Sequence, residues 1–176
     1  VIASVLPLAG VGHTMPLFFT TQTPAHNAAL LGNLGALVLD FCARVKVGGT
    51  HLTYGYFKQF PILPPDRYTE ADLAYIVPRV LELTYTAHDL AGWAHDLGHN
   101  GPPFPFAPER RAQLRAELDA YYARLYGLTR DELRYILDPA DVLGEDYPSE
   151  TFRVLKNKEL REFGEYRTQR LVLAAW

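Results

Sequence analysis

Helix signals in the second half of the chain constrain its fold more than any other feature. One apolar face at helical spacing is formed by Leu114, Leu118, Tyr121, Tyr122 and Leu125. Gly127 follows at a position where glycine commonly ends a helix. Thr129 and Glu132 then form a capping box, which predicts a new helix that continues to Leu137. The chain is therefore expected to be predominantly helical.

The flanking sequence predicts further helices across residues 68–176. Thr69 and Asp72 form a carboxylate variant of the capping box. Pro78 is expected to kink or break the helix that they open, and a further helical stretch should end at Gly98. After a loop at Asp138–Pro148, two last helices are predicted over 149–162 and 165–175.

Residues 1–67 combine strand-like and helical patterns. Val1–Leu6 and Met15–Thr20 are short apolar runs, which predict two strands. Apolar side chains at helical spacing predict one helix over 27–46, ended by the pair Gly48-Gly49. Tyr54–Ile62 is rich in aromatic residues and is expected to be extended. The predicted fold is α+β and predominantly helical, with short N-terminal strands, a helix and an extended segment in 1–67 and a helical region in 68–176.

Composition and cysteine content narrow the class of protein. Hydrophobic residues make up 48% of the 176 residues, which is enough for a packed core. The single cysteine, Cys42, excludes an internal disulfide and lies in an apolar run, so we expect a structural thiol and a cytoplasmic protein. The chain enters a strand-like run directly at Val1, without a signal-peptide pattern or a membrane-span-length apolar stretch. It is accordingly expected to be a fragment of a longer protein.

Motifs for cofactor binding and catalysis are missing. The sequence contains no Gly-x-Gly-x-x-Gly or phosphate-binding Gly-x-x-x-x-Gly-Lys loop, no Asn-Pro-Pro-Tyr segment and no Gly-x-Ser-x-Gly elbow. We therefore expect no catalytic residue, no metal ligand and no cofactor on this chain.

Two clusters of ionisable residues have both a functional and a structural interpretation. The first could bind zinc through imidazoles or could be a solvated helix face: His88, Asp89, His95, Asp96 and His99. The second could bind Mg²⁺ or could simply form turns: Asp138, Asp141, Glu145 and Asp146. The structural interpretation is favoured for both.

A basic segment in the middle of the chain suits nucleic acid. From Phe41 to Pro65 it has three cations and no acid, a local charge of +3 in a chain with a formal net charge of -3. Cations neutralise phosphates, glycines permit close backbone approach, and polar or aromatic side chains can bond or stack on bases. The candidate DNA-binding residues are Arg44, Lys46, Gly48, Gly49, Thr50, His51, Thr53, Tyr54, Tyr56, Lys58 and Gln59. By composition alone, an ordinary basic loop is an equal alternative.

A resemblance favours DNA binding. The run Gly48-Gly49-Thr50-x-Leu52, followed by Lys58-Gln59-x-Pro61-Ile62-x-Pro64, resembles the TaqI-like target-recognition domain of N6-adenine DNA methyltransferases and type IIG restriction–modification enzymes. The opening at Val1–His13 is similar to the strand and loop before that domain's helix. The stretches 115–139 and 151–168 are similar to the helical region at the C-terminus of such proteins.

The resemblance implies a role within a larger enzyme. Residues 1–67 would be the C-terminal part of a DNA target-recognition domain, and 68–176 a helical C-terminal region. The partners would be double-stranded DNA and an upstream methyltransferase domain of the same polypeptide. That parent would use S-adenosylmethionine, with Mg²⁺ if it also carries a nuclease.

Two other classes of function stay open at this point. The net charge of -3 and the helical content suit a protein–protein docking domain of a restriction or phage-defence assembly. An enzyme built on the cluster from His88 to His99 is the more remote alternative. Residues 151–170 carry six basic and three acidic residues, which form either a phosphate-binding face or a solvated helix surface.

Overall fold

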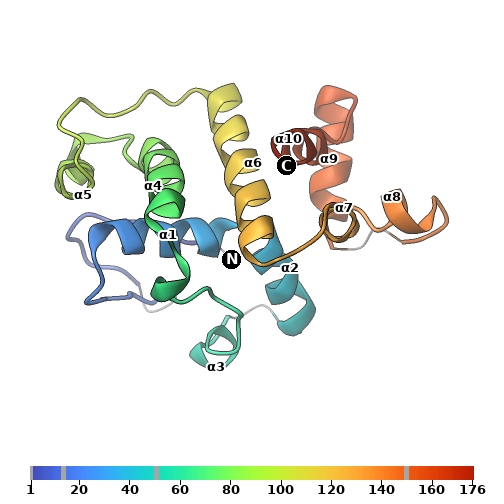
Figure 1. The fold of residues 1–176 in the computed structure, drawn as a ribbon, viewed down its shortest axis with the longest axis horizontal. Coiled ribbons are helices and arrows are strands. Elements are labelled where there is room, and N and C mark those ends of the chain that lie inside the picture. The colour runs from blue at the N-terminus through green and yellow to red at the C-terminus, as the bar shows by residue number, and fades with distance from the viewer. Residues whose placement is uncertain (1, 13–14, 50–51, 149–150) are drawn as a thin grey trace.

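The computed structural model describes residues 2–12, 15–49, 52–148 and 151–176, and its regular structure is helical (Figure 1). Ten α-helices lie within these ranges: α1 (Pro24–Gly35), α2 (Leu37–Lys46), α3 (Tyr54–Phe57), α4 (Glu70–Thr84), α5 (Ala91–Asp96), α6 (Pro108–Leu125), α7 (Arg130–Leu137), α8 (Ala140–Leu143), α9 (Arg153–Phe163) and α10 (Arg167–Ala175). Two short 3₁₀ turns, Pro65–Arg67 and His88–Leu90, complete the order. Among the described residues, no single helix is long and apolar enough to cross a membrane; only the bent pair α1 and α2, taken together, has such a length and composition.

The predicted α+β class is wrong, because the described part of the chain contains no strand. The described residues of the expected strands Val1–Leu6 and Met15–Thr20 form no regular structure. A strand needs a neighbour to pair its backbone N–H and C=O groups, and none lies beside them in these ranges. Their apolar side chains are also largely in solvent, with Ile2 102% and Phe19 90% exposed.

The prediction that Tyr54–Ile62 is extended is also wrong, because this segment begins with the single-turn helix α3. The aromatic residues of this segment alternate only in part, and Phe57 and Phe60 are three residues apart, which is a helical spacing. Helical turns bring both rings to the same side, where they lie 5.9 Å apart between centroids. They join Leu34 and Leu39 in a small apolar cluster.

The helix caps predicted for the second half are confirmed, whereas the loop predicted at Asp138–Pro148 contains the short helix α8. Thr69 and Thr129 each accept a hydrogen bond from the backbone three residues on, and both capping boxes are complete. Gly127 has φ of +76°, a left-handed conformation that glycine adopts readily. Pro78 does not break its helix, since α4 continues through it from Glu70 to Thr84.

The single helix predicted over 27–46 is two helices. Ala36 is extended between α1 and α2, and their axes bend by 56° at this residue. The break gives α2 its own N-terminus, whose backbone donors need new partners. Helix α2 ends at Lys46, just before Gly48-Gly49, although neither glycine has a positive φ.

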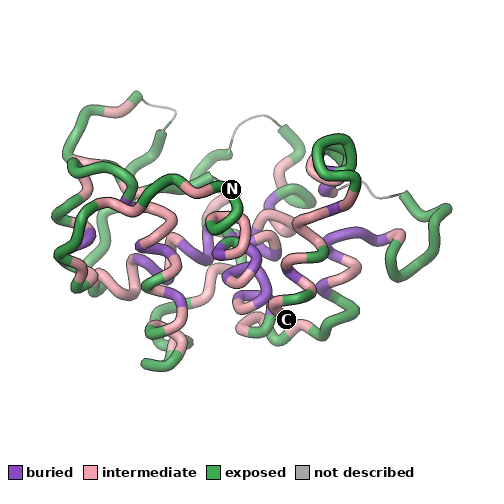
Figure 2. The backbone as a smooth tube through the Cα atoms, turned by 90° about the horizontal axis from the view of Figure 1, so that it is seen from above, coloured by how far each residue is buried: buried purple, intermediate pink, exposed green. Residues whose placement is uncertain are grey.

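Helix α6 runs through the centre of the molecule and joins two groups of helices (Figure 1). On one side, α1 and α4 bury Ala28, Ile76 and Val80 against Tyr122 of α6. On the other side, α7 and α10 bury Leu137 and other apolar side chains against the small residues of α6. Buried backbone accordingly gathers through the middle of the molecule (Figure 2). Helices from 1–67 and from 68–176 thus share one core.

Candidate nucleic-acid interface

The residues predicted to contact DNA lie on an exposed surface around α3 and the end of α2. We call this the α3 surface, and its described members are all exposed: Arg44, Lys46, Gly48, Gly49, Thr53, Tyr54, Tyr56, Lys58 and Gln59. Thr50 and His51 lie outside the described residues. In Figure 1 the surface occupies the lower edge of the molecule, below α1 and α6.

Aromatic packing places α3 against Phe18 of the N-terminal segment. The ring of Phe57 lies 4.9 Å from that of Phe18, which also meets Tyr54 edge-on at 6.2 Å. The Gln59 side-chain amide donates to the carbonyl oxygen of Gly55 at 2.7 Å and closes the turn. This contact gives Gln59 a structural role, whereas the aromatic contacts leave Tyr54 and Tyr56 facing solvent.

A fully buried asparagine anchors the chain that follows α3. Asn33 of α1 accepts from the backbone N–H of Leu63 at 3.0 Å and donates to the Tyr126 hydroxyl at 2.8 Å. These two bonds tie the Pro61–Pro65 stretch to both α1 and α6. The prediction of site residues missed Asn33, although an amide within an apolar helix sequence is a signal that could have found it.

A buried carboxylate positions the start of α2. Asp119 of α6 accepts a hydrogen bond from the Leu37 backbone N–H at 2.8 Å and so satisfies one free donor at the N-terminus of α2. Burial raises the pKa of Asp119 to about 7, although this hydrogen bond and the nearby Arg115 act in the opposite direction. Asp119 was also missed; its place between Leu118 and Tyr122 on the apolar face of α6 is the clue.

The cations of the α3 surface differ in how they are engaged. Arg44 pairs with Asp40 at 2.7 Å, donates to the Thr151 carbonyl at 3.4 Å and lies over the Phe152 ring at 5.2 Å. It therefore joins α2 to the start of α9. Within the described ranges, Lys46 and Lys58 form no ion pair and remain available to an anionic ligand.

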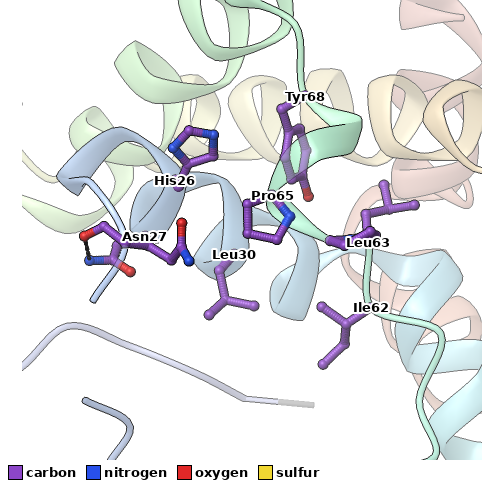
Figure 3. Close-up of a pocket in the computed structure, with 9 residues that line it drawn as sticks. His26, Asn27, Leu30, Ile62, Leu63, Pro65 and Tyr68 are labelled. Carbon is purple, nitrogen blue, oxygen red and sulfur yellow. Dashed lines mark hydrogen bonds between the residues drawn. The ribbon is translucent and has the colours of Figure 1, made fainter. Parts of the chain in front are cut away.

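A small cavity lies behind the α3 surface, between the first turns of α1 and the stretch from Ile62 to Tyr68 (Figure 3). Its volume is about 160 Å³, and most of its wall is apolar. His26 faces it and holds its Nδ1 2.7 Å from the Thr23 hydroxyl oxygen, at the N-cap of α1. The cavity can accommodate a small apolar group.

The two ionisable clusters do not form metal sites in the part of the chain that the structure describes, where no group of three or more His, Cys, Asp or Glu side chains could hold an ion. The His99 ring packs on Phe104 at 4.8 Å, beyond the end of α5. Asp138 is buried in an ion pair with Lys156, and Asp141 pairs with Arg134 at 2.8 Å. Cys42 is partly buried, which raises the pKa of its thiol.

Comparison with known proteins identified no relative of this chain. The chain matches no protein-family model, and no curated protein or solved structure was found to match it. The motifs of the sequence and the α3 surface are therefore the features from which a function can be inferred.

Proposed function

We propose that this chain is a DNA-binding specificity fragment of a larger adenine-specific DNA methyltransferase or restriction–modification enzyme. One observation carries the proposal: the stretch that resembles a target-recognition domain has an acid-free sequence and contributes exposed polar side chains, among them two lysines that form no ion pair with a described residue. An upstream methyltransferase domain of the same polypeptide would supply S-adenosylmethionine binding and the methyl transfer. Mg²⁺ would be required only if that polypeptide also carries a nuclease.

The chemistry of the α3 surface suits the phosphate backbone and the bases in different ways. Lys46 and Lys58 can neutralise phosphates, which supplies affinity that depends on salt but not on sequence. The exposed rings of Tyr54 and Tyr56 can stack or donate hydrogen bonds to bases, which is where sequence preference arises. The buried anchor at Asn33 would limit the conformational entropy lost on binding.

Charge reversal at the two lysines tests the proposal directly. We expect K46E/K58E, in the longest polypeptide that contains this chain, to weaken duplex binding by at least about tenfold and to lower its salt dependence. Arg44 is a poorer target because its ion pair with Asp40 is part of the packing. The measurement is fluorescence anisotropy with duplexes selected from a random pool, at several salt concentrations.

A control reverses a cation far from α3. Arg130 begins α7, on the right of the molecule in Figure 1, and forms no ion pair with a described residue. R130E should leave duplex affinity unchanged. The proposal fails if the polypeptide binds no duplex better than random sequence, or if R130E weakens binding as much as K46E/K58E does.

The docking-domain alternative is favoured by one specific observation. Large apolar side chains are exposed along the N-terminal segment, among them Ile2, Leu8, Met15, Phe18 and Phe19. Exposed apolar surface of this kind commonly marks a protein interface. If K46E/K58E keeps its DNA affinity while Phe19→Asp separates the chain from a partner subunit, the docking function takes precedence.

A further inference from the structure

A cluster of charged side chains lies between α4 and the first turns of α6, at the opposite end of α6 from α3 (Figure 1). It contains four guanidinium groups and two carboxylates: Arg79, Glu82, Arg110, Arg111, Arg115 and Glu117. The cluster therefore has two more cations than anions. The two carboxylates are both engaged by the other pair of arginines, since Arg110 holds Glu82 at 2.9 and 3.0 Å, and Arg79 holds Glu117 at 2.8 Å.

Arg111 and Arg115 are the cations in excess. Neither forms a hydrogen bond or an ion pair with any residue that the structure describes. Nη1 of Arg111 is buried without an acceptor, and burial lowers the pKa of this guanidinium. Arg115 lies one helical turn further along α6 and is exposed.

An aromatic ring holds the Arg111 guanidinium in place. Its Cζ lies 4.5 Å from the ring centroid of Phe106, which is itself 69% exposed at the molecular surface. Stacking on the ring fixes the plane of the guanidinium group before a ligand binds, so less conformational entropy is lost on binding. A partly buried guanidinium next to a second cation at i+4 is unfavourable by itself. An oxyanion bound by both guanidinium groups would relieve this repulsion.

We propose that Arg111 and Arg115 form a binding site for a phosphate group. Two guanidinium forks offer more donors than one carboxylate can accept, whereas a phosphate has oxygens for both. The excess of two positive charges in the cluster also matches a phosphate dianion. The site does not depend on the proposed function, because it shares no residue with the α3 surface.

Calorimetric titration of inorganic phosphate into the full chain, at constant ionic strength, tests the site. We expect saturable binding that R115Q weakens about tenfold and R111Q/R115Q abolishes. R130Q is the matched control, since Arg130 is likewise exposed at the start of a helix and forms no ion pair with a described residue, and it should leave the affinity unchanged. If R111Q impairs folding, R115Q decides alone, because Arg115 is exposed and has no hydrogen bond or ion pair to a described residue that the substitution would remove.

The outcomes separate the source of the phosphate from the existence of the site. If R115Q also weakens duplex binding, the ligand is the DNA backbone; if duplex binding is unchanged, the ligand is a free phosphate or nucleotide. K46E/K58E should leave the phosphate titration as it is, so failure of the proposed DNA function would not affect this result. Absence of saturable phosphate binding by the unmodified chain, or equal affinity in R115Q, would overturn the proposal.

Discussion

Asn33 shows how a single buried residue fixes the chain on which the α3 surface depends. Asn33→Ala would leave the Leu63 N–H and the Tyr126 hydroxyl without their partner. Each unmet buried group costs about 1–3 kcal/mol, so we expect the free energy of unfolding to fall by about 3 kcal/mol. Urea denaturation measures the loss. Asn157→Ala on the exposed side of α9 should change stability by less than about 0.5 kcal/mol, and equal effects of the two substitutions would contradict this role for Asn33.

The buried carboxyl of Asp119 makes stability depend on pH. Its pKa in the folded protein is about 7, above the ordinary value of 3.8 for an aspartate. Between these values the folded state keeps a proton that the unfolded chain has released, so stability falls as pH rises through this window. Asp119→Asn keeps an oxygen acceptor for the Leu37 N–H but cannot ionise.

The loss of stability between pH 5 and pH 8 should therefore be smaller in Asp119→Asn than in the unmodified chain. Urea denaturation at the two pH values measures both losses, and the difference between them isolates Asp119 from other titrating groups. An identical pH dependence of the two proteins would show that Asp119 is already ionised at pH 5.

Residue roles could be predicted from sequence only where both partners are close in the chain. Thr69 with Asp72, and Thr129 with Glu132, lie three residues apart, and both capping boxes were predicted correctly. The bond between Asn33 and Tyr126 spans 93 residues and that between Asp119 and Leu37 spans 82, so no local pattern contains either. The polar composition of the segment indicates an exposed α3 surface. It does not indicate that Asn33 anchors the chain after α3.

At the scale of elements, the packing of α1 against α4 and against the Tyr122 side chain of α6 depends on one glycine. A Cβ at Gly32 would lie 2.9 Å from the Tyr122 hydroxyl oxygen, which donates to the Ala29 carbonyl at 2.7 Å. Gly32→Ala should therefore cost about 1–3 kcal/mol, as overpacking in a core commonly does.

Gly35 on the same helix supplies the control. A Cβ there would meet no atom within 4 Å, so Gly35→Ala should be neutral or stabilise the protein by up to about 1 kcal/mol. Thermal unfolding of the two variants compares them directly. A Gly32→Ala protein as stable as the unmodified chain would mean that α1 can shift away from Tyr122 and Val80 without loss.

Helices were easier to predict than extended elements for a physical reason. A helix satisfies its backbone within itself, so local spacing and caps such as Thr129 are informative. A strand needs a partner that sequence alone does not identify, and the runs at 1–6 and 15–20 have the composition of strands without that partner. The bend at Ala36 was missed, and the Asp119 carboxyl that accepts from the Leu37 N–H just after it lies on another helix.

At the scale of the whole molecule, the change in sequence character near residue 67 is not matched by a gap in the core. Ala28 and Ala29 of α1 pack with Ile76 and Val80 of α4 and with Tyr122 of α6. A chain of residues 68–176 alone would expose this surface, and exposed core surface lowers stability by roughly 25 cal/mol per Å².

We therefore expect 68–176 to lose cooperative unfolding, whereas the full chain unfolds in one transition. Circular dichroism and calorimetry of both chains provide the test, because a shared core couples the two parts into one cooperative unit. Adding 1–67 as a separate chain should restore part of the transition, since the apolar contacts need no covalent link. A sharp, independent transition of 68–176 would instead mean that α6, α7 and α10 form a sufficient core.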